Sequence, residues 1–363
     1  MVGKKKKLLF IYLHPNSFVL DDLDILAHNY DVDSYQFRID HQSFKGVSLF
    51  IEWVMQFIWL IRELRSVDLV MGWFIDYHML LPVFLSRLFG KSTIICEGGF
   101  GCLNIPEFRH GVFFSWWRKH IARYITRSVS FLIPVTEKLI DSENTYTVWP
   151  EKRRYGLKQE IPGLATPYRV VPTGYDSDKW PMGAAGRPER VCTVGFINSI
   201  RTFKIKGIDL VIEVSKLMPD TEFVIVGVEK EFREVIKKEY EPPKNLVMRT
   251  PVNRSELKEI YMNSSVYIQL SRVEGLPNVM CESMLCGCIP VGSPVFGIPD
   301  IVGDTGYIIE SPDPKHIAEI TRKALSDGPE SRIKARDQII NNFSSKKRYE
   351  MLVEVIEEFI KSR

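Results

Sequence analysis

The most informative stretch of the sequence is residues 266–291, which read VYIQLSRVEGLPNVMCESMLCGCIPV. An apolar run at Val266–Leu270 predicts a buried strand, and a loop leads from it to a helical segment at Asn278–Leu285. A second apolar run, Ile289–Val291, predicts the next buried strand. Strand, helix and strand in close succession are typical of a parallel sheet that is covered by helices on both faces.

The same alternation extends through both halves of the chain. In the C-terminal half we predict further strands and helices at Arg190–Ile197, Gly207–Leu217, Glu222–Val226, Glu229–Tyr240, Leu246–Thr250, Ser255–Asn263, 314–326, 330–342 and 346–361. In the N-terminal half we predict them at Leu8–Leu13, Tyr35–Phe37, Leu49–Leu64, Asp68–Trp73, Tyr77–Phe89, Ser92–Cys96, Val112–Thr126 and Phe131–Val135. We therefore expect an α/β protein with two Rossmann-like, doubly wound parallel-sheet domains.

A segment rich in Gly, Pro and Ala separates the two halves. Residues 181–188 read PMGAAGRP and lack the periodicity of a helix or strand, which is typical of a linker. We expect an N-terminal domain over residues 1–180 and a C-terminal domain that starts at residue 189. Ligands of doubly wound sheets bind beyond the carboxyl ends of the strands, so two such domains facing each other would bind ligands in a cleft.

The composition fits a folded two-domain protein. The chain has 363 residues, 45% hydrophobic and 26% charged, which excludes a disordered chain, a collagen and a disulfide-rich miniprotein. Its 48 Lys and Arg nearly balance 45 Asp and Glu, so general nucleic-acid binding is not indicated. We expect a reduced cytoplasmic protein, because no secretory signal precedes the six cysteines. The longest apolar stretch, Val47–Ile61, is too short to span a bilayer.

The loop and helix after Leu270 carry groups suited to a phosphorylated, hydroxyl-rich ligand. Gly275 lets the backbone approach a ligand closely, and Pro277 is suited to open a helix whose free N–H groups attract phosphate. Glu274 and Glu282 can accept hydrogen bonds from hydroxyl groups. Each glutamate alone is more commonly a solvated surface acid. Glu282, however, lies in an otherwise largely apolar helix, where a carboxylate needs a partner.

A second strand, loop and helix carry two cations. Residues 194–210 read VGFINSIRTFKIKGIDL, with Gly195 near the end of the strand and Arg201 and Lys206 further along. Two cations beside a helix N-terminus suit a diphosphate and stabilise negative charge that develops on it. Without other context, solvated surface cations are the commoner interpretation.

These residues resemble the signature of retaining GT-B glycosyltransferases, specifically glycosyltransferase family 4. The resemblance lies in Glu274-x7-Glu282 followed by CGCIPV at 286–291. The pair Arg201-x4-Lys206, followed by glycine, matches the paired cations of that family in type and spacing.

Two more elements resemble the same family and occur in the family's order. VVPTGYDSDKW at 170–180 is similar to its NGID element, and FGIPDIV at 296–302 is similar to its GGIPEII stretch. The likeness is good over roughly residues 130–345 and covers the first 130 residues only in outline.

The resemblance implies a role for each site residue. Arg201 and Lys206 would hold the diphosphate of a UDP- or GDP-sugar, and Glu282 would bind the ribose. Glu274 would position the donor sugar together with the backbone of the loop. The donor-binding set also includes Gly195, Gly275, Leu276 and Pro277.

The resemblance also implies the reaction and its setting. It implies a hexosyltransferase with a retained anomeric configuration, no metal and no other cofactor. The acceptor would be a glycan or a lipid-linked molecule in surface polysaccharide, glycolipid or glycoprotein glycan assembly. The C-terminal domain would end at residue 345, and the last helix, 346–363, would pack back on the N-terminal, acceptor-binding domain.

The N-terminal half departs from the family at two places. Where many members have a Gly-Gly loop, residues 14–17 read HPNS. Where many have a histidine that contacts the donor sugar, this chain has Glu97, followed by glycines at positions 98, 99 and 101. Glu97 can accept a hydrogen bond from a sugar hydroxyl, so we count it as a candidate catalytic residue. The glycines suit either close approach of the backbone to a ligand or a tight turn.

Other short motifs favour structural interpretations. Cys281, Cys286 and Cys288 lack the paired spacing of a zinc site, so we expect small buried residues and no metal. The D-x-D patterns that begin at Asp22 and Asp31 are interpreted as turn or cap residues.

Residues 112–127, VFFSWWRKHIARYITR, combine aromatic residues with cations. This pattern suits either a helix at a membrane interface or a core-packing helix with a solvated cationic face. The Trp-containing stretch Leu49–Leu64 and the cationic run Lys4–Lys7 add to the first interpretation. We therefore expect peripheral association of the N-terminal domain with an anionic membrane at its inner face. The cations in question are Arg118, Lys119, Arg123 and Arg127.

Two other functions stay open from the residues. A nucleotide-sugar epimerase of GT-B fold would convert its donor without an acceptor, although the paired cations and glutamates favour a transferase. A non-catalytic glycan-binding subunit stays open because Glu97 departs from the family pattern. A nicotinamide dehydrogenase is disfavoured, since no G-x-G-x-x-G follows the first strand of either half.

Overall fold

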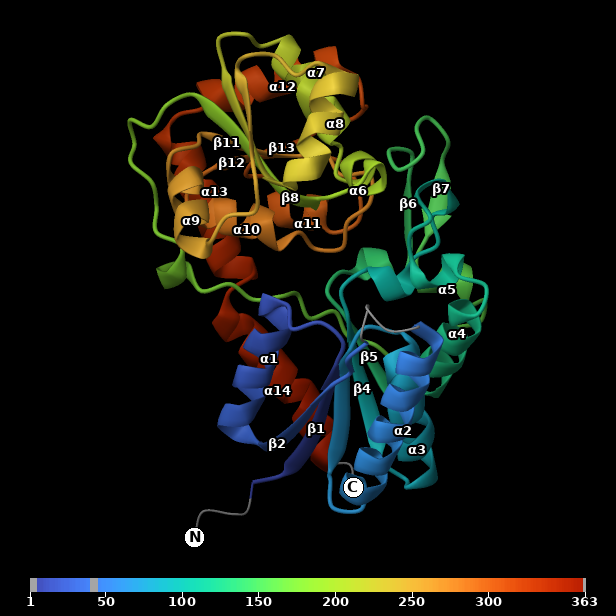
Figure 1. Ribbon diagram of the computed structural model, residues 1–363. Helices are drawn as coiled ribbons and strands as arrows, with labels where there is room; N and C mark the ends of the chain where they lie inside the picture. The colour runs from blue at the N-terminus through green and yellow to red at the C-terminus, as the bar shows by residue number, and fades with distance from the viewer. Residues whose placement is uncertain (1–4, 40–44, 362–363) are drawn as a thin grey trace. The chain divides into compact units, whose positions relative to one another are not determined.

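A computed structural model describes residues 5–39 and 45–361, and it confirms the α/β class (Figure 1). The chain divides into two compact units, each built on one parallel sheet. Unit 1 comprises Met1–Ser142, Tyr155–Thr173 and Arg348–Arg363. Unit 2 comprises the remaining segments, Glu143–Arg154 and Gly174–Lys347.

Each unit consists of two or three separate segments of the chain, whereas the predicted N-terminal and C-terminal domains are continuous. The glycine- and proline-rich segment 181–188 belongs to unit 2, because the buried guanidinium of Arg187 donates to the carbonyls of Ser264 and Cys286, at 2.8 and 3.1 Å. A methyl group on Gly183 would lie 2.2 Å from the Met262 carbonyl oxygen, so this backbone packs closely against unit 2.

Unit 1 has a five-stranded sheet in the order β2-β1-β3-β4-β5, with every pair parallel. Helices α1 and α14 cover one face, and α2, α3 and α4 cover the other (Figure 1). The strands are β1 Lys7–Tyr12, β2 Asp31–Gln36, β3 Leu69–Trp73, β4 Ser92–Glu97 and β5 Phe131–Pro134. The helices are α1 Ser17–Asn29, α2 Lys45–Glu63, α3 Leu80–Leu88, α4 Arg118–Ser128, α5 Leu157–Glu160 and α14 Ser345–Lys361.

Unit 2 has a six-stranded parallel sheet in the order β10-β9-β8-β11-β12-β13. The strand order reverses between β8 and β11, which is where doubly wound folds bind ligands. The strands are β8 Arg190–Ile197, β9 Glu222–Val228, β10 Leu246–Arg249, β11 Val266–Gln269, β12 Ile289–Gly292 and β13 Tyr307–Ile308. The helices are α6 Ile200–Ile205, α7 Ile208–Lys216, α8 Lys230–Tyr240, α9 Arg254–Met262, α10 Asn278–Leu285, α11 Ile298–Val302, α12 Pro314–Ser326 and α13 Pro329–Asn342. Two short strands, β6 Ser142–Asn144 and β7 Arg153–Tyr155, pair separately.

The predicted elements are present, with two kinds of error. Helices α1, α5, α6 and α11 and strands β6, β7 and β13 were not predicted. The helix predicted from Val112 begins only at Arg118. Val112 and Phe113 are instead buried in a 3-10 turn that follows Gly111 at φ 97°, a conformation that favours glycine.

Asp22 is not a turn or cap residue, because it lies inside α1 and is fully buried. Its carboxylate accepts two hydrogen bonds from Arg348 of α14, at 2.6 and 2.5 Å, and one from the Trp73 indole of β3 at 2.9 Å. Arg348 is 3% exposed and also donates to the carbonyl of Val171 at 2.8 Å. The pair therefore joins the last helix of the chain to the first helix and to the central strand.

No helix in the described part of the chain is long and apolar enough to cross a bilayer.

We predict that Asp22→Asn destabilises unit 1 by about 3–5 kcal/mol, because it leaves the Arg348 guanidinium buried without a counter-charge. Chemical unfolding, followed by circular dichroism, measures this change. Glu213→Gln is the control, since Glu213 pairs with Lys216 on the surface of α7 and its loss should cost under about 1 kcal/mol. Equal effects of the two substitutions would contradict the role of the buried pair.

Candidate active site

Two loops meet beyond the carboxyl ends of β8 and β11 in unit 2. The loop after β11 carries Glu274, and the segment after β8 carries Lys206 between α6 and α7. The Lys206 ammonium lies 2.6 Å from Glu274 Oε2. Residues 68 positions apart thus form an ion pair at the point where the strand order reverses.

A chain of polar side chains from β11 holds Glu274 in place. Ser271 Oγ and Gln269 Nε2 lie 3.2 and 3.3 Å from Glu274 Oε2 and donate to it. Tyr267 donates in turn to Gln269 Oε1 at 2.7 Å. Tyr267, Gln269 and Ser271 are all buried, so the carboxylate orientation is set before any ligand arrives.

A second ionic network supports the loop from behind. Asp209 of α7 accepts hydrogen bonds from Arg272 at 2.8 and 3.0 Å and from Lys204 at 2.8 Å. Burial raises the pKa of Asp209, but hydrogen bonds and charge from these two cations outweigh that effect and lower it. Thr147, from the segment between β6 and β7, donates to the Arg272 carbonyl at 2.8 Å. Sequence analysis missed these residues, because nothing in their spacing indicates that they meet.

Two glycines let the Lys206 segment approach the sheet. Gly207 has φ 67°, and a methyl group there would lie 2.0 Å from the Leu270 carbonyl oxygen. Only glycine fits this position without moving the backbone. A methyl group on Gly195 would lie 3.4 Å from Lys206 Cγ, so the lysine stem packs directly over this residue of β8.

The loop Gly275 to Pro277 is buried and anchored by backbone bonds. The Gly297 N–H donates to the Gly275 carbonyl at 2.9 Å. Leu276 is 8% exposed. Helix α10 begins at Asn278, so Pro277 precedes the first helical residue and does not itself open the helix. The early N–H groups of α10 nevertheless follow directly after the loop, as expected.

Glu282 is buried on α10, as its apolar surroundings predict. The guanidinium of Arg254, from α9, lies 3.9 Å from Glu282 Oε1 and 5.8 Å from the centre of the Trp180 ring. The carboxylate therefore has a cation nearby, which meets the expectation that a buried acid needs a partner.

Arg201 and Lys206 lie at opposite ends of α6. Arg201 is exposed in the first turn, after the Ser199 cap, whereas Lys206 follows the last residue of that helix. The structure therefore does not place both cations beside one helix N-terminus, because α6 separates them by its own length of about 9 Å. Both still follow β8 on the side of the sheet where Glu274 lies.

Glu97, in unit 1, is turned toward the backbone. Its Oε2 accepts the Ile75 N–H at 2.8 Å, and its Oε1 accepts those of Gly99 and Gly101 at 2.8 and 3.1 Å. Burial raises the Glu97 pKa to about 7, although the three N–H groups act to lower it. A methyl group on Gly101 would lie 2.2 Å from the carboxylate, so this glycine is needed for close approach to Glu97.

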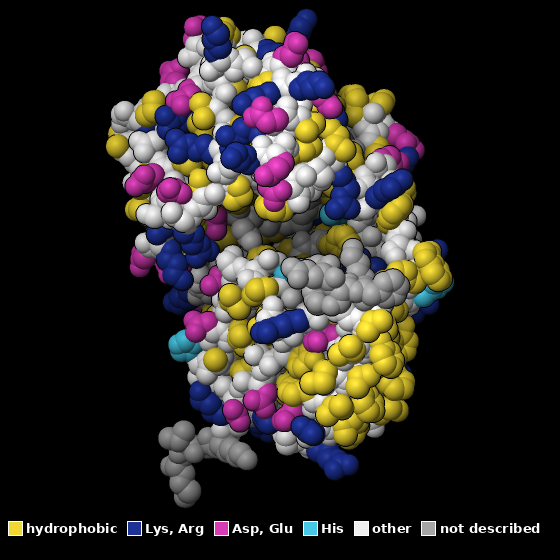
Figure 2. All heavy atoms as spheres, in the orientation of Figure 1, with side chains coloured by type: hydrophobic (Ala, Val, Ile, Leu, Met, Phe, Trp, Pro, Cys, Tyr) yellow, Lys and Arg dark blue, Asp and Glu magenta, His cyan; other side chains and the backbone are white. Residues whose placement is uncertain are grey.

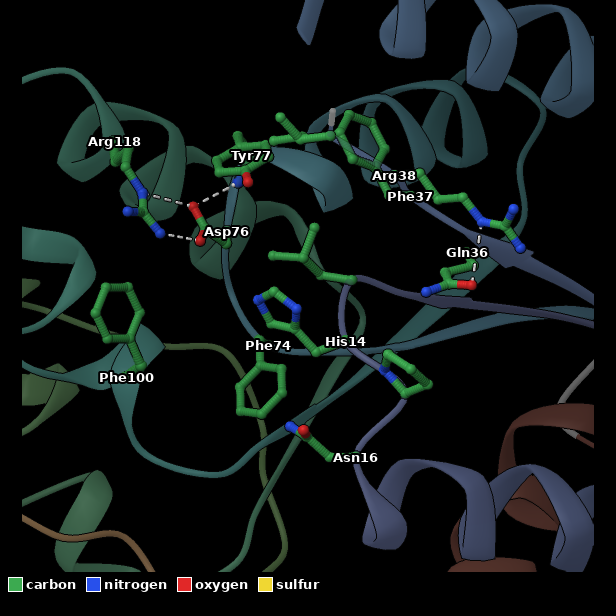
Figure 3. A pocket seen from close by; sticks show the side chains of 13 residues that line it. His14, Asn16, Gln36, Phe37, Arg38, Phe74, Asp76, Tyr77, Phe100 and Arg118 are labelled. Atoms are coloured by element: carbon green, nitrogen blue, oxygen red, sulfur yellow. Dashed lines mark hydrogen bonds and ion pairs between the residues drawn. The ribbon is translucent and has the colours of Figure 1, made fainter. Parts of the chain in front are cut away.

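Unit 1 contains a separate cavity of about 680 Å³ (Figure 3). Its wall includes His14 and Asn16, from the HPNS segment where the chain departs from the family. Arg118 also lines this cavity. It forms an ion pair with Asp76, and its guanidinium lies 4.9 Å from the centre of the Phe100 ring. Arg118 is therefore part of the cavity wall and not a free surface cation.

The described residues contain no group of three His, Cys, Asp or Glu side chains that could hold a metal ion. All six cysteines belong to this part of the chain, and each is a buried free thiol. Cys281, Cys286 and Cys288 thus occupy the small, buried positions expected for them.

Comparison with known proteins finds a family model that matches the part of unit 2 containing the site. Residues 193–346 match the family Glycosyl transferases group 1, and this range includes Lys206, Glu274 and Glu282. One component of the phosphatidylinositol N-acetylglucosaminyltransferase of Arabidopsis thaliana is 23% identical over 163 residues, which cover 43% of this chain and 36% of that protein. The chain spans about two fifths of the length of the curated relatives it matches.

Solved structures resemble the chain over almost its whole length. Sucrose-phosphate synthase from Thermosynechococcus elongatus is 13% identical, with a TM-score of 0.77 over 99% of this chain and 100% of that chain. HepE from Anabaena, in complex with UDP-glucose, is 13% identical, with a TM-score of 0.70 over 97% and 99% of the two chains. At such low identity the likeness shows the fold alone. The fold is that of the GT-B glycosyltransferases, and the match to Glycosyl transferases group 1 covers less than half of the chain.

Proposed function

We propose that the protein is a retaining glycosyltransferase of family 4 that acts as a hexosyltransferase. It moves a sugar from a UDP- or GDP-sugar to a glycan or lipid-linked acceptor. The observation that carries this proposal is the Lys206–Glu274 pair at the reversal of strand order, within the matched domain. That HepE binds UDP-glucose supports the donor class.

The donor would be held by positive charge at its diphosphate and by hydroxyl contacts on either side of it, at the sugar and at the ribose. Lys206 and Arg201 carry the positive charge that a diphosphate needs, and the ammonium of Lys206 has three donors to share between phosphate and Glu274. Glu274 then accepts from a hydroxyl of the sugar, together with the backbone of Gly275, Leu276 and Pro277. Glu282, on the second turn of α10, accepts from the ribose.

The reaction follows from this positioning. The acceptor hydroxyl attacks the anomeric carbon on the face that the diphosphate leaves, so the configuration is retained. The bond from that carbon to the diphosphate oxygen breaks, a bond to the acceptor oxygen forms, and the departing diphosphate takes the hydroxyl proton. The protein supplies orientation and positive charge, with Lys206 stabilising the negative charge that develops on the diphosphate. No step in this scheme needs a metal or other cofactor.

The proposed setting is the cytoplasm, at the inner face of a membrane, in surface polysaccharide, glycolipid or glycoprotein glycan assembly. Six buried free thiols suit a reducing compartment. The cations of α4 suit an anionic surface, although one of them, Arg118, forms an ion pair with Asp76. The Arabidopsis relative is a subunit of a phosphatidylinositol N-acetylglucosaminyltransferase, and this supports a lipid-linked acceptor.

Two alternatives differ in their products. A nucleotide-sugar epimerase would change its donor with no acceptor present, and a non-catalytic glycan-binding subunit would leave every donor unchanged. Release of a nucleoside diphosphate only when acceptor is present distinguishes a transferase from both.

We predict that Lys206→Ala lowers kcat/KM for the donor by roughly 100-fold or more, because it removes charge that stabilises the leaving diphosphate. Glu282→Ala should raise the donor KM by about tenfold or more, since a hydrogen bond to a charged group is lost on binding. Steady-state assays of nucleoside diphosphate release measure both effects.

Lys216→Ala is the matched control for Lys206→Ala. Lys216 lies at the far end of α7 and pairs with Glu213 on the surface, so its loss should leave both constants unchanged. Near-normal transfer by both Lys206→Ala and Glu282→Ala would overturn the assignment of the site.

Glu97 has a structural role in this proposal, because its carboxylate oxygens already accept three backbone hydrogen bonds. Its raised pKa means that the folded state binds a proton more tightly than the unfolded state does. Stability should therefore fall as pH rises from about 4.5 to about 7. With each pKa unit worth about 1.4 kcal/mol, the full change is about 3 kcal/mol.

We predict that Glu97→Gln removes this part of the pH dependence. Urea unfolding of both proteins between pH 4.5 and 7.5 measures it, because titrations common to both proteins cancel in the difference. Parallel stability curves for wild type and Glu97→Gln would show that Glu97 does not titrate in this range.

A further inference from the structure

Helix α2 of unit 1 exposes a row of large apolar side chains, which is unusual for a helix on a protein surface. Seven large apolar side chains on it are 40–66% exposed. They run along the helix at the spacing of one face, so they form a continuous outward stripe about 17 Å long. These residues are Val47, Phe50, Ile51, Val54, Met55, Phe57 and Ile58.

Polar groups midway along the same helix form hydrogen bonds with the rest of unit 1. Gln56 is buried and donates to the His78 carbonyl at 2.9 Å. Glu52 accepts from the Tyr35 hydroxyl at 2.9 Å, and the Trp53 indole donates to the Tyr77 carbonyl at 3.3 Å. The bonds of Glu52, Trp53 and Gln56 fix the helix rotation, so the apolar stripe cannot turn inward without breaking them.

The stripe continues onto the neighbouring helix. Phe84 and Leu88 of α3, which packs beside α2, are 44% and 67% exposed. Figure 2 shows the apolar side chains as one broad yellow surface on unit 1. Monomeric proteins rarely expose so large a continuous apolar area unless it binds something. We call the seven α2 residues with Phe84 and Leu88 the α2 face.

Cations outnumber acids on the helices that carry and adjoin the α2 face. Helices α2, α3 and α4 carry seven Lys and Arg but only two acids, Glu52 and Glu63. Glu63 accepts from the Lys7 ammonium at 2.8 Å, so both acids are engaged within the protein. Arg62, at the end of α2, and Arg65 and Arg87 nearby are exposed.

We propose that the α2 face docks on an anionic lipid bilayer, with its apolar side chains in the interface and its arginines at the phosphates. A second copy of the chain fits less well, because a two-fold contact would set the same arginines against each other. An apolar helix face with flanking cations is what an interfacial helix needs. The inference deepens the proposed function, whose lipid-linked acceptor would lie at that surface.

The test is sedimentation of the full chain with phosphatidylcholine vesicles, alone and with about one third phosphatidylglycerol. We expect binding that is stronger to the anionic vesicles. F50Q/I51Q/M55Q should abolish binding to both kinds of vesicle. R62Q/R65Q should weaken binding to the anionic vesicles by roughly fivefold for each cation removed, and should leave binding to phosphatidylcholine vesicles unchanged. V235Q/V247Q/I333Q, which removes three exposed apolar side chains of unit 2, should bind like wild type.

The outcomes separate the proposals. Unchanged vesicle binding by F50Q/I51Q/M55Q, or no binding by wild type, would overturn the docking surface. Self-association of wild type that this variant abolishes, without vesicle binding, would assign the α2 face to a second copy instead. Because exposed apolar side chains are replaced, the variant should keep its thermal unfolding temperature. Vesicle binding needs no sugar donor, so a failure here and a failure of the transferase proposal are told apart.

Discussion

The ion pair between Lys206 and Glu274 connects the two halves of the unit 2 sheet at the point where the strand order reverses, between β8 and β11. Each partner follows a different strand, and neither loop has regular structure at the contact. The pair forms because Gly207 lets one segment press onto the Leu270 carbonyl and because buried Ser271 and Gln269 orient the carboxylate. A partly buried pair of this kind is maintained only when its surroundings satisfy both charges.

Much of the rest of unit 2 supports that contact. Asp209 and Arg272 connect α7 to the loop after β11, and the Thr147 hydroxyl attaches the segment between β6 and β7 to the same loop. Helix α10 starts directly after the loop and carries Glu282 on its buried side. A nucleotide-diphosphate sugar bound as proposed would have its diphosphate at Lys206, its sugar at Glu274 and its ribose at Glu282. This arrangement is the physical basis for the proposed donor orientation.

The sequence predicts the longer elements of unit 2, because their buried strands are short apolar runs, but it misses the short elements α6, α11 and β13. Helix α10 has the predicted bounds, 278–285. The sequence predicts less about contacts between residues that are far apart along the chain. Asp22 and Arg348 are separated by 326 positions, and only the folded chain shows that Asp22 is a buried counter-charge. Similarly, the apolar residues of α2 indicate a helix, but whether they face the core depends on the bonds of Glu52 and Gln56. The role of Glu97 also depends on the backbone that surrounds it.

The most direct measurement is thermal unfolding with UDP, GDP, ADP and NAD added separately to wild type and to Lys206→Ala. A ligand at one hundred times its Kd stabilises the folded state by about 2.7 kcal/mol, which raises the unfolding temperature by several degrees. We predict such a shift with UDP or GDP in the wild-type protein, and its loss or marked reduction in Lys206→Ala. A shift that persists unchanged in the variant, or a shift with NAD alone, would contradict a nucleotide-sugar site at the Lys206–Glu274 pair.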